Sequence, residues 1–291
     1  MHFFSRKYLK VALTVIFLVS TALLVISIAD KKDAEDTYLQ AQQIAGLAEE
    51  TAARPTETEP AVEEVAPTEP ETVPEETKPR TVWVPAAVEP DEYMEKLADT
   101  DLDALRQTNP DVVGWIFIPN SKVNYPIMQG EDNRYYLEHT WDNKKNSAGS
   151  IFLEATNAPD LKDHRSVLYG HNMADMSMFA VLHNYAGIRY AELFPYVYLV
   201  TDEGVLRYEI YSTYKAAVDG KTYALNLDQR IMASFIKMTL EESELDLGVM
   251  PADTDRILTL STCTGSNETR RVVHARLVME EIEVNENAPQ G

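Results

Sequence analysis

The segment Val11–Ala29 ("VALTVIFLVSTALLVISIA") contains no charged residue and no proline. Nineteen helical residues at about 1.5 Å each span roughly the hydrocarbon thickness of a bilayer. Arg6, Lys7 and Lys10 precede the segment, and a basic flank stays on the cytoplasmic side of a membrane. We therefore expect residues 11–29 to be a single-pass signal-anchor in the cell membrane, with residues 1–10 in the cytoplasm and the C-terminal bulk of the chain extracellular.

The alternative for this segment is a cleaved secretory signal. The apolar core of such a signal is about 7–15 residues long, which is shorter than the run observed here. No cysteine lies near residue 30, so a lipid-modified N-terminal cysteine is excluded. With either interpretation the main domain is exported.

The stretch that follows is rich in proline and glutamate. Eight of the 15 prolines lie between residues 31 and 90, where 14 acidic residues outnumber five basic ones. Such a composition cannot bury enough apolar surface to offset its ordering entropy. We expect residues 30–88 to form a disordered extracellular stalk, although residues 31–50 could continue the anchor helix for several turns.

Charge limits the partners of the chain, whose formal net charge is −21. A surface this acidic repels nucleic acid and anionic lipid headgroups, so neither is expected to bind the folded part. The sequence also contains no phosphate-binding glycine loop, no cysteine-based zinc site and no His-Glu pair at helical metal spacing. We expect no metal and no cofactor.

The composition becomes globular from Glu89 onward. "EPDEYMEKLADTDLDALRQTNPDVVGW" predicts two short helices, and "LDQRIMASFIKMTLEES" predicts one later helix. Between and after them lie short segments rich in β-branched and aromatic residues, such as "GSIFLE" and "RILTLSTC". Many short strands with few helices favour a mainly β domain, a barrel or a sandwich. The predicted domain covers residues 89–285, and residues 286–291 form a tail.

The single cysteine of the chain is Cys263. It ends the predicted strand "ILTLSTC" and precedes the turn-forming "TGSNET", so its side chain can face a cleft at the end of a strand. One interpretation is a small buried hydrophobic residue. The other is a nucleophile, because an exported protein with one thiol either risks oxidation or uses the sulfur. Use of the sulfur requires a thiolate or a nearby base.

Histidines are the candidate bases. His171 directly follows "SVLYG", a predicted strand that ends in glycine, and could therefore lie beside the thiol at a second strand end. His139, His164 and His183 lie in polar contexts, where a solvated imidazole is expected. His274 lies within a predicted strand, either packed or on the surface.

Arginines provide the third candidate group, because "RRVVHAR" follows Cys263 by seven to thirteen residues. After a short turn this strand should run antiparallel to "LTLSTC", which brings Arg270 or Arg271 near the sulfur. Side chains alternate along a strand, so only one of the two can face the cleft. A guanidinium there could hold a thiolate or bind an oxyanion. The alternative is a surface strand whose arginines pair with acidic residues.

Together, "LYGHN", "TLSTC" and an arginine before "VVHARL" resemble the sortase family of exported cysteine transpeptidases over residues 90–285. The segment "VNYPIMQGEDNRYYLEHTWDNKKNSAGSIFLE" and the helices resemble class B sortases in particular. This resemblance implies an eight-stranded β-barrel and a Cys263 that cleaves the Thr-Gly or Thr-Asn bond of a sorting signal. It implies that His171 acts as acid and base, that an arginine stabilises the oxyanion, and that an amine of a lipid II-type cell-wall peptide precursor accepts the protein.

The resemblance also assigns further residues. Aligning "R-x-V-V-x-A" selects Arg270 as the active-site arginine, with Arg271 as the alternative because the spacing from Cys263 is slightly short. The substrate-binding residues that we expect are Asn133, Leu137, Tyr169, Ser261 and Tyr223, the last in the loop "VDGKTYALNLD".

Three other functions remain open at this point. A pilin-polymerising sortase would use a pilin lysine as the acceptor. An L,D-transpeptidase is also an exported cysteine acyl-transferase, but its Ser-x-Gly-Cys context is absent here. A non-catalytic adhesion domain would bury Cys263.

Overall fold

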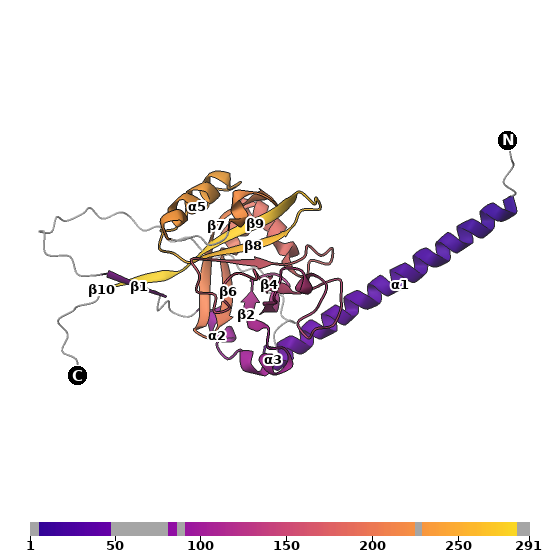
Figure 1. Cartoon of the computed structure of the whole chain (residues 1–291), viewed down its shortest axis with the longest axis horizontal. Helices are drawn as coiled ribbons and strands as arrows, with labels where there is room; N and C mark the ends of the chain where they lie inside the picture. Colours follow the sequence, from indigo (N-terminus) through magenta and orange to yellow (C-terminus); the bar gives the residue numbers. More distant parts are fainter. Residues whose placement is uncertain (1–5, 48–80, 86–90, 225–228, 284–291) are drawn as a thin grey trace, which may run out of the picture.

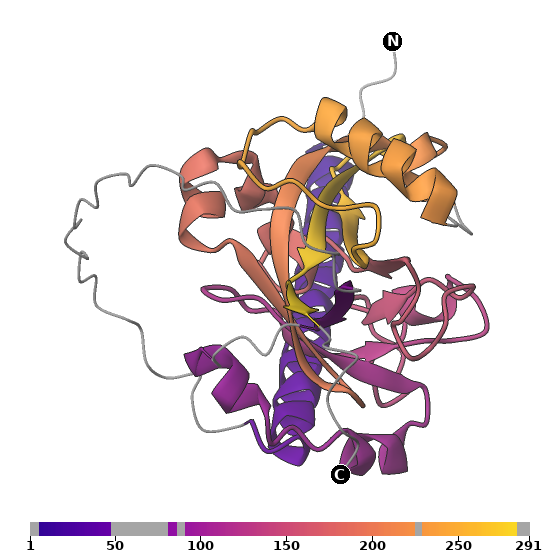
Figure 2. The ribbon, with the colours of Figure 1, turned by 90° about the vertical axis from the view of Figure 1, so that its left-hand side faces the viewer.

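The computed structural model describes residues 6–47, 81–85, 91–224 and 229–283. Eight strands form a closed barrel in the order β2-β3-β4-β5-β8-β9-β7-β6 (Figures 1 and 2), which confirms the predicted fold class. The barrel strands are β2 (Val112–Phe117), β3 (Asn124–Met128), β4 (Ile151–Leu153), β5 (Arg165–Tyr169), β6 (Tyr196–Thr201), β7 (Gly204–Ala217), β8 (Ile257–Cys263) and β9 (Thr269–Leu277).

The predicted helices are also present. The two short helices before the barrel are α2 (Glu92–Leu97) and α3 (Leu102–Thr108), and the later helix is α5 (Gln229–Glu242). The Asp91 carboxylate caps α2 by accepting hydrogen bonds from the next backbone amides, at 3.0 Å to Tyr93 and 3.0 Å to Met94. Short helices in the connections are η1 (Tyr135–Leu137), η2 (Phe179–Ala186), α4 (Ile188–Leu193) and η3 (Lys221–Tyr223).

Strand β8 has two different faces. Leu258 and Leu260 point into the main hydrophobic core. Because side chains alternate along a strand, Thr259, Ser261 and Cys263 point to the outside of the barrel. Helix α5 covers part of this outer face, where its Phe235 ring packs edge-on against His274 of β9 at 5.8 Å (centroid distance). The last residue of β8 is therefore at the end of the barrel and on its outer surface.

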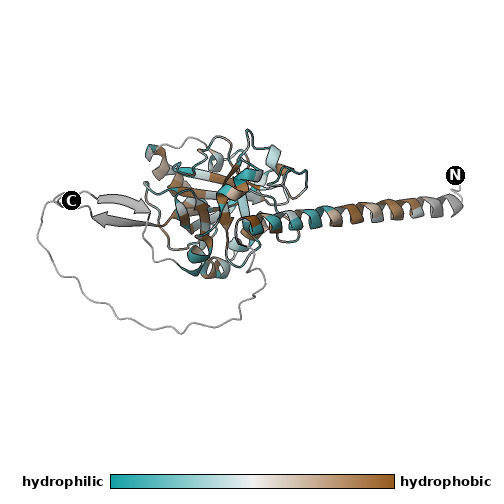
Figure 3. Cartoon of the chain, turned by 90° about the horizontal axis from the view of Figure 1, so that it is seen from below, coloured by the Kyte–Doolittle hydropathy of each residue, from teal (hydrophilic) through white to brown (hydrophobic). Residues whose placement is uncertain are grey.

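Helix α1 (Arg6–Ile44) is 39 residues long and extends from the domain beside α3 (Figure 1). It contains an 18-residue window with a mean hydropathy of 2.6, none of which is buried in the protein. In Figure 3 the projecting part is coloured as hydrophobic, whereas the part beside the domain is mixed. By length and composition, α1 can cross a membrane, as predicted.

The second half of α1 packs against the barrel, which corrects the predicted start of the stalk at residue 30. Ala34, Tyr38, Ala41 and Ala45 recur at helical spacing and are buried. The small side chains of the three alanines let the helix approach β3 closely, and Gln42 Nε2 donates to the Asn124 carbonyl at 3.0 Å. Residues 30–47 therefore belong to the folded domain.

The rest of the predicted stalk is only partly described. Residues 81–85 form strand β1 (Thr81–Pro85), which pairs antiparallel with β10 (Met279–Glu283), so these residues are also not stalk. Residues 48–80 and 86–90, like the predicted tail 286–291, lie outside the described residues.

Candidate active site around Cys263

The carboxyl ends of β5 and β8 meet at the same level of the barrel. The two strands run parallel, with Tyr169 opposite Ser261. His171 and Cys263 each lie two residues beyond this pair. The Gly170 amide donates to the Ser261 carbonyl at 3.2 Å, which continues the register past the end of β5. The fold thus brings the predicted base and the predicted nucleophile to adjacent strand ends.

The glycine before His171 is required by packing. A Cβ at Gly170 would lie 2.8 Å from Cδ2 of Phe179, which is closer than real Cβ contacts. The Phe179 amide also donates to the His171 carbonyl at 2.9 Å, and Thr262 Oγ1 donates to the Gly170 carbonyl at 2.8 Å. The backbone that carries His171 is therefore held from both sides.

The imidazole of His171 has a defined hydrogen-bond partner. Its Nε2 lies 2.8 Å from the carbonyl oxygen of Leu137, which belongs to η1. A carbonyl oxygen only accepts hydrogen bonds, so Nε2 carries the proton. In the neutral ring Nδ1 then carries the lone pair, and Nδ1 is the nitrogen that can exchange a proton with a reacting group.

Cys263 is partly exposed, so the interpretation as a buried thiol does not hold. Its backbone is fixed by His183, whose Nε2 donates to the Cys263 carbonyl at 2.9 Å. The expectation of a solvated His183 was wrong, because η2 folds back under the barrel end and half-buries this ring. The sequence gives little indication of this contact, which joins residues 80 positions apart.

The two arginines lie on opposite faces of β9. Arg270 is directly opposite Cys263 and Arg271 opposite Thr262, and cross-strand partners share a face. Arg271 is only 3% exposed and pairs with Glu244 at 2.8 Å. Arg270 is partly exposed, and its Nη1 donates to the Thr269 carbonyl at 2.9 Å. Of the two arginines, only Arg270 shares a face with the thiol.

The predicted substrate-binding residues Tyr169, Ser261 and Tyr223 form one cluster next to the thiol. The Tyr223 hydroxyl lies 2.8 Å from Ser261 Oγ, and the Tyr169 and Tyr223 rings stack with their centroids 6.4 Å apart. Burial raises the pKa of Tyr223, while the charges of Arg270 and Arg165 oppose this increase. The phenol thus lies within electrostatic reach of the guanidinium on the face of the thiol.

Glu154 joins this cluster and was missed from the sequence. It is 4% exposed and accepts hydrogen bonds from Tyr169 Oη at 2.9 Å and from Asn133 Nδ2 at 2.7 Å. Burial, and then Glu154, raises the pKa of Tyr169. The Asn133 side-chain oxygen accepts from the Ala155 amide. Asn133 is therefore linked to the tyrosine cluster through Glu154. The sequence did contain an indication of this role, because Glu154 directly follows the apolar run "SIFL".

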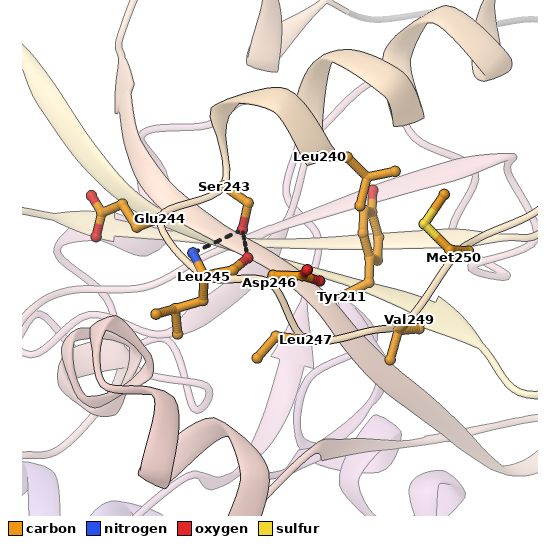
Figure 4. Close-up of a pocket in the computed structure, with 9 residues that line it drawn as sticks. All are labelled: Tyr211, Leu240, Ser243, Glu244, Leu245, Asp246, Leu247, Val249 and Met250. Atoms are coloured by element: carbon orange, nitrogen blue, oxygen red, sulfur yellow. Dashed lines mark hydrogen bonds between the residues drawn. The ribbon is translucent and has the colours of Figure 1, made fainter.

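Two further features contain none of the predicted site residues. A cavity of about 380 Å³ is lined by Tyr211 of β7 and by residues of the 240–250 segment, among them Glu244 (Figure 4). His274 is completely buried between Thr259 Oγ1 at 3.0 Å and Tyr214 Oη at 3.2 Å, and burial lowers its pKa to about 3. Within the described ranges, no three His, Cys, Asp or Glu side chains gather as a metal-ligand set.

The family model of the sortase domain matches residues 116–278, which is more than half of the chain. The chain belongs to the sortase family. It is 33% identical to Sortase B of Listeria monocytogenes over 185 residues, covering 61% of this chain and 74% of the relative. It is 30% identical to Sortase B of Staphylococcus aureus over 174 residues, covering 59% and 71%.

Solved sortase structures have the same fold. The substrate complex of S. aureus sortase B superposes with a TM-score of 0.57 at 30% identity, covering 61% of this chain and 84% of that one. Sortase B of Clostridium perfringens gives a TM-score of 0.58 at 28% identity, covering 61% and 100%. The protein is therefore a sortase-type cysteine transpeptidase, most like class B.

Proposed function

We propose that this sortase is anchored in the cell membrane by α1 and transfers exported proteins from their sorting signals to a cell-wall peptide amine. The observation that supports it best is the arrangement of three groups. Cys263 and His171 lie at the ends of adjacent parallel strands, and Arg270 is the cross-strand partner of the cysteine. A nucleophile, a proton-transfer group and a cation on one face are what acyl transfer requires.

In the first step the Cys263 thiolate attacks the carbonyl carbon of the threonine in a sorting signal. The C–S bond forms as the carbonyl π electrons move to the oxygen. When the tetrahedral intermediate collapses, the C–N bond to the next residue breaks. His171, as the imidazolium, gives its Nδ1 proton to the leaving amine. The products are a thioester on Cys263 and a free amine, with His171 neutral.

In the second step an amine from a cell-wall peptide precursor attacks the thioester. The Nδ1 lone pair of His171 accepts the proton that this amine loses, and the Cys263 thiolate leaves. The ion pair of thiolate and imidazolium is thereby restored. One amide has been exchanged for another through a thioester, so the reaction needs no ATP.

Arg270 is proposed to stabilise the negative oxygen in both steps. A preorganised donor aimed at developing charge lowers the barrier because it does not reorganise during the reaction. Tyr169, Tyr223 and Ser261 are proposed to line the groove that holds the signal, with Leu137 at its exposed edge. We propose a Thr-Gly or Thr-Asn bond as the cleaved bond.

The acceptor is the least constrained part of this proposal. One related structure is described as sortase B complexed with a three-glycine peptide, which supports a peptide amine as the acceptor. A lipid II-type precursor fits an enzyme that is held at the membrane by α1. A pilin lysine is the competing acceptor.

A peptide-library assay tests the proposal. The full-length chain in detergent micelles is incubated with pentapeptides that vary around Pro-x-Thr-Gly and Pro-x-Thr-Asn, with triglycine or a lysine-containing pilin peptide as the acceptor. Mass spectrometry should detect an acyl adduct on Cys263 and a transpeptidation product with triglycine. A Cys263→Ala variant that still cleaves these peptides would refute the role of the thiol, and a product with only the lysine acceptor would favour pilus assembly.

A further inference from the structure

Helix α1 contacts the segment that holds the catalytic imidazole. We propose that α1, through Tyr38, positions His171 for proton transfer by fixing the carbonyl of Leu137. Tyr38 is then a positioning residue that acts through Gly149 and Ser150. The inference rests on the proposed role of His171, and it gives the anchor helix a function in the chemistry in addition to membrane attachment.

The first link joins α1 to residues 149 and 150. Tyr38 is 4% exposed, and its hydroxyl donates to the Gly149 carbonyl and lies 3.1 Å from Ser150 Oγ. The ring packs edge-on against Tyr125 of β3, with centroids 4.9 Å apart. Packing therefore sets the position of the ring, and the hydroxyl transmits that position to the 149–150 backbone.

The second link joins residues 149 and 150 to η1. The Ser150 amide donates to the Tyr136 carbonyl at 2.8 Å, and Ser150 Oγ donates to the His139 carbonyl at 2.8 Å. Gly149 has a φ of +58°, and a Cβ there would lie 2.7 Å from the Leu137 carbonyl oxygen. The backbone at Gly149 therefore lies directly against the peptide group of Leu137.

The third link is the hydrogen bond from His171 Nε2 to that same Leu137 carbonyl, at 2.8 Å. Helix α1 holds the 135–150 segment at other points as well. Trp141 Nε1 donates to the Thr37 carbonyl at 3.0 Å, and Asn146 Nδ2 donates to the Asp30 carbonyl at 2.8 Å. The segment that orients the imidazole is thus attached to α1 at Asp30, Thr37 and Tyr38, over about two turns of the helix.

The physical consequence concerns the ion pair of thiolate and imidazolium. A carbonyl that accepts from Nε2–H stabilises the protonated ring. If the Leu137 carbonyl moves away, the imidazolium loses this support, and less thiolate forms at neutral pH. Above about pH 10 a cysteine thiol ionises without help from a histidine, so the effect should disappear there.

The test measures the rate at which a methanethiosulfonate reagent modifies Cys263 of the full-length chain in detergent micelles, between pH 5 and pH 10. For Tyr38→Phe we expect a rate about fivefold lower at pH 7, a profile displaced to higher pH, and an unchanged rate at pH 10. General damage to the fold would lower the rate at every pH. The matched control is Tyr185→Phe, which also removes one buried phenol-to-carbonyl hydrogen bond, to Phe194 at 3.0 Å, and should leave the profile unchanged.

A second variant acts closer to the imidazole. Gly149→Ala forces the Leu137 carbonyl to move, so its rate at pH 7 should fall more than tenfold with the same recovery at pH 10. If Tyr38→Phe melts below the assay temperature, Ser150→Ala replaces it. Coincident profiles for wild type and Tyr38→Phe, or an equal displacement for Tyr185→Phe, would overturn the inference.

This readout uses no sorting peptide, so it is separate from the test of the proposed function. The pH profile of thiol modification can depend on both His171 and Tyr38 even if the enzyme cleaves no sorting peptide. That result would refute the proposed substrate and retain the positioning role of Tyr38. Peptide cleavage with an unchanged rate and pH profile in Tyr38→Phe would refute the positioning role of Tyr38 while supporting the proposed function.

Discussion

Two histidines lie on the same outer face of the barrel and have opposite properties. His274 is completely buried beneath α5, with one ring nitrogen near Thr259 and the other near Tyr214. His171 lies at the partly exposed end of the barrel, and its Nε2 bonds the Leu137 carbonyl. His274 lies within β9, whereas His171 lies two residues beyond the end of β5. Only the ring beyond the strand end is exposed enough to exchange a proton with a substrate.

The difference shows which surroundings make a histidine useful for catalysis. Burial lowers the pKa of His274 to about 3, so this ring remains neutral and serves as a hydrogen-bonded part of the core. A proton-transfer group instead needs one nitrogen fixed by a partner and the other directed at the reacting atoms. Substitution of either histidine, or of the charged groups around the thiol, should therefore affect catalytic activity and stability to different extents.

The largest effect is expected for His171→Gln. General acid–base catalysis contributes about 10²–10⁴-fold, so kcat/KM for transpeptidation should fall roughly 10³-fold. The melting temperature should stay within about 2 °C of wild type, because the side chain is at the surface of the barrel end. Peptide cleavage kinetics and calorimetry measure both. Retention of even a tenth of the activity would exclude His171 as the proton-transfer group.

Substitution of Arg270 should mainly lower activity, whereas substitution of its neighbour Arg271 should mainly lower stability. Arg270→Ala should reduce kcat/KM by about 10²-fold with little change in melting temperature, as for the loss of an oxyanion donor. Arg271→Ala leaves Glu244 without its buried partner. Because Glu244 is partly exposed, we expect a loss of about 1–3 kcal/mol in the free energy of unfolding. The reverse pattern in kinetics and urea unfolding would reassign the active-site arginine to Arg271.

The pH dependence of stability should depend on His274. In the unfolded chain this group binds a proton near its ordinary pKa of 6.5, whereas in the folded protein it does so only at about 3. Between these values the unfolded state binds more protons, so stability decreases as the pH falls, by about 1.4 kcal/mol per pH unit from this group. Above about pH 6.5 the contribution of neutral His274 to the free energy of unfolding is fully present.

Urea unfolding of wild type and His274→Gln at several pH values between 7 and 4 measures this slope. The variant should be less stable at pH 7. Its free energy of unfolding should also fall less steeply on acidification, with a slope smaller by about 1.4 kcal/mol per pH unit, which corresponds to one proton. Equal slopes in the two proteins would show that His274 is not held neutral by burial. Activity at pH 7 should remain within about threefold of wild type, in contrast to His171→Gln.

The smallest effect is expected for Glu154→Gln. The amide can still accept from Asn133 and can donate to the Tyr169 hydroxyl, so the cluster around Tyr169 keeps its shape but loses a charge. We expect KM for the sorting peptide to rise about threefold with kcat unchanged, in line with the loss of one charge-assisted hydrogen bond. A large decrease in kcat would instead place Glu154 in the chemistry.

Local patterns in the sequence were sufficient to predict where several strands and helices of this protein lie. Alternating β-branched residues followed by turn residues predicted that Cys263 ends a strand, and "SVLYG" predicted the same for the residue before His171. Both signals depend on a few neighbouring residues. The apolar run of residues 11–29 likewise predicted the helix from length and composition alone.

Only the tertiary structure decided which distant groups meet. The choice between Arg270 and Arg271 depends on the register across the β8–β9 turn, because a shift of one residue reverses every side chain. The burial of His274, and the contact of Glu154 with Tyr169, follow from how the barrel closes and from what α5 covers. The docking of residues 30–47 depends on a complementary surface on β3 and on the 135–150 segment. Hydrophobic periodicity is a property of a single segment, whereas register and shape complementarity belong to two segments at once.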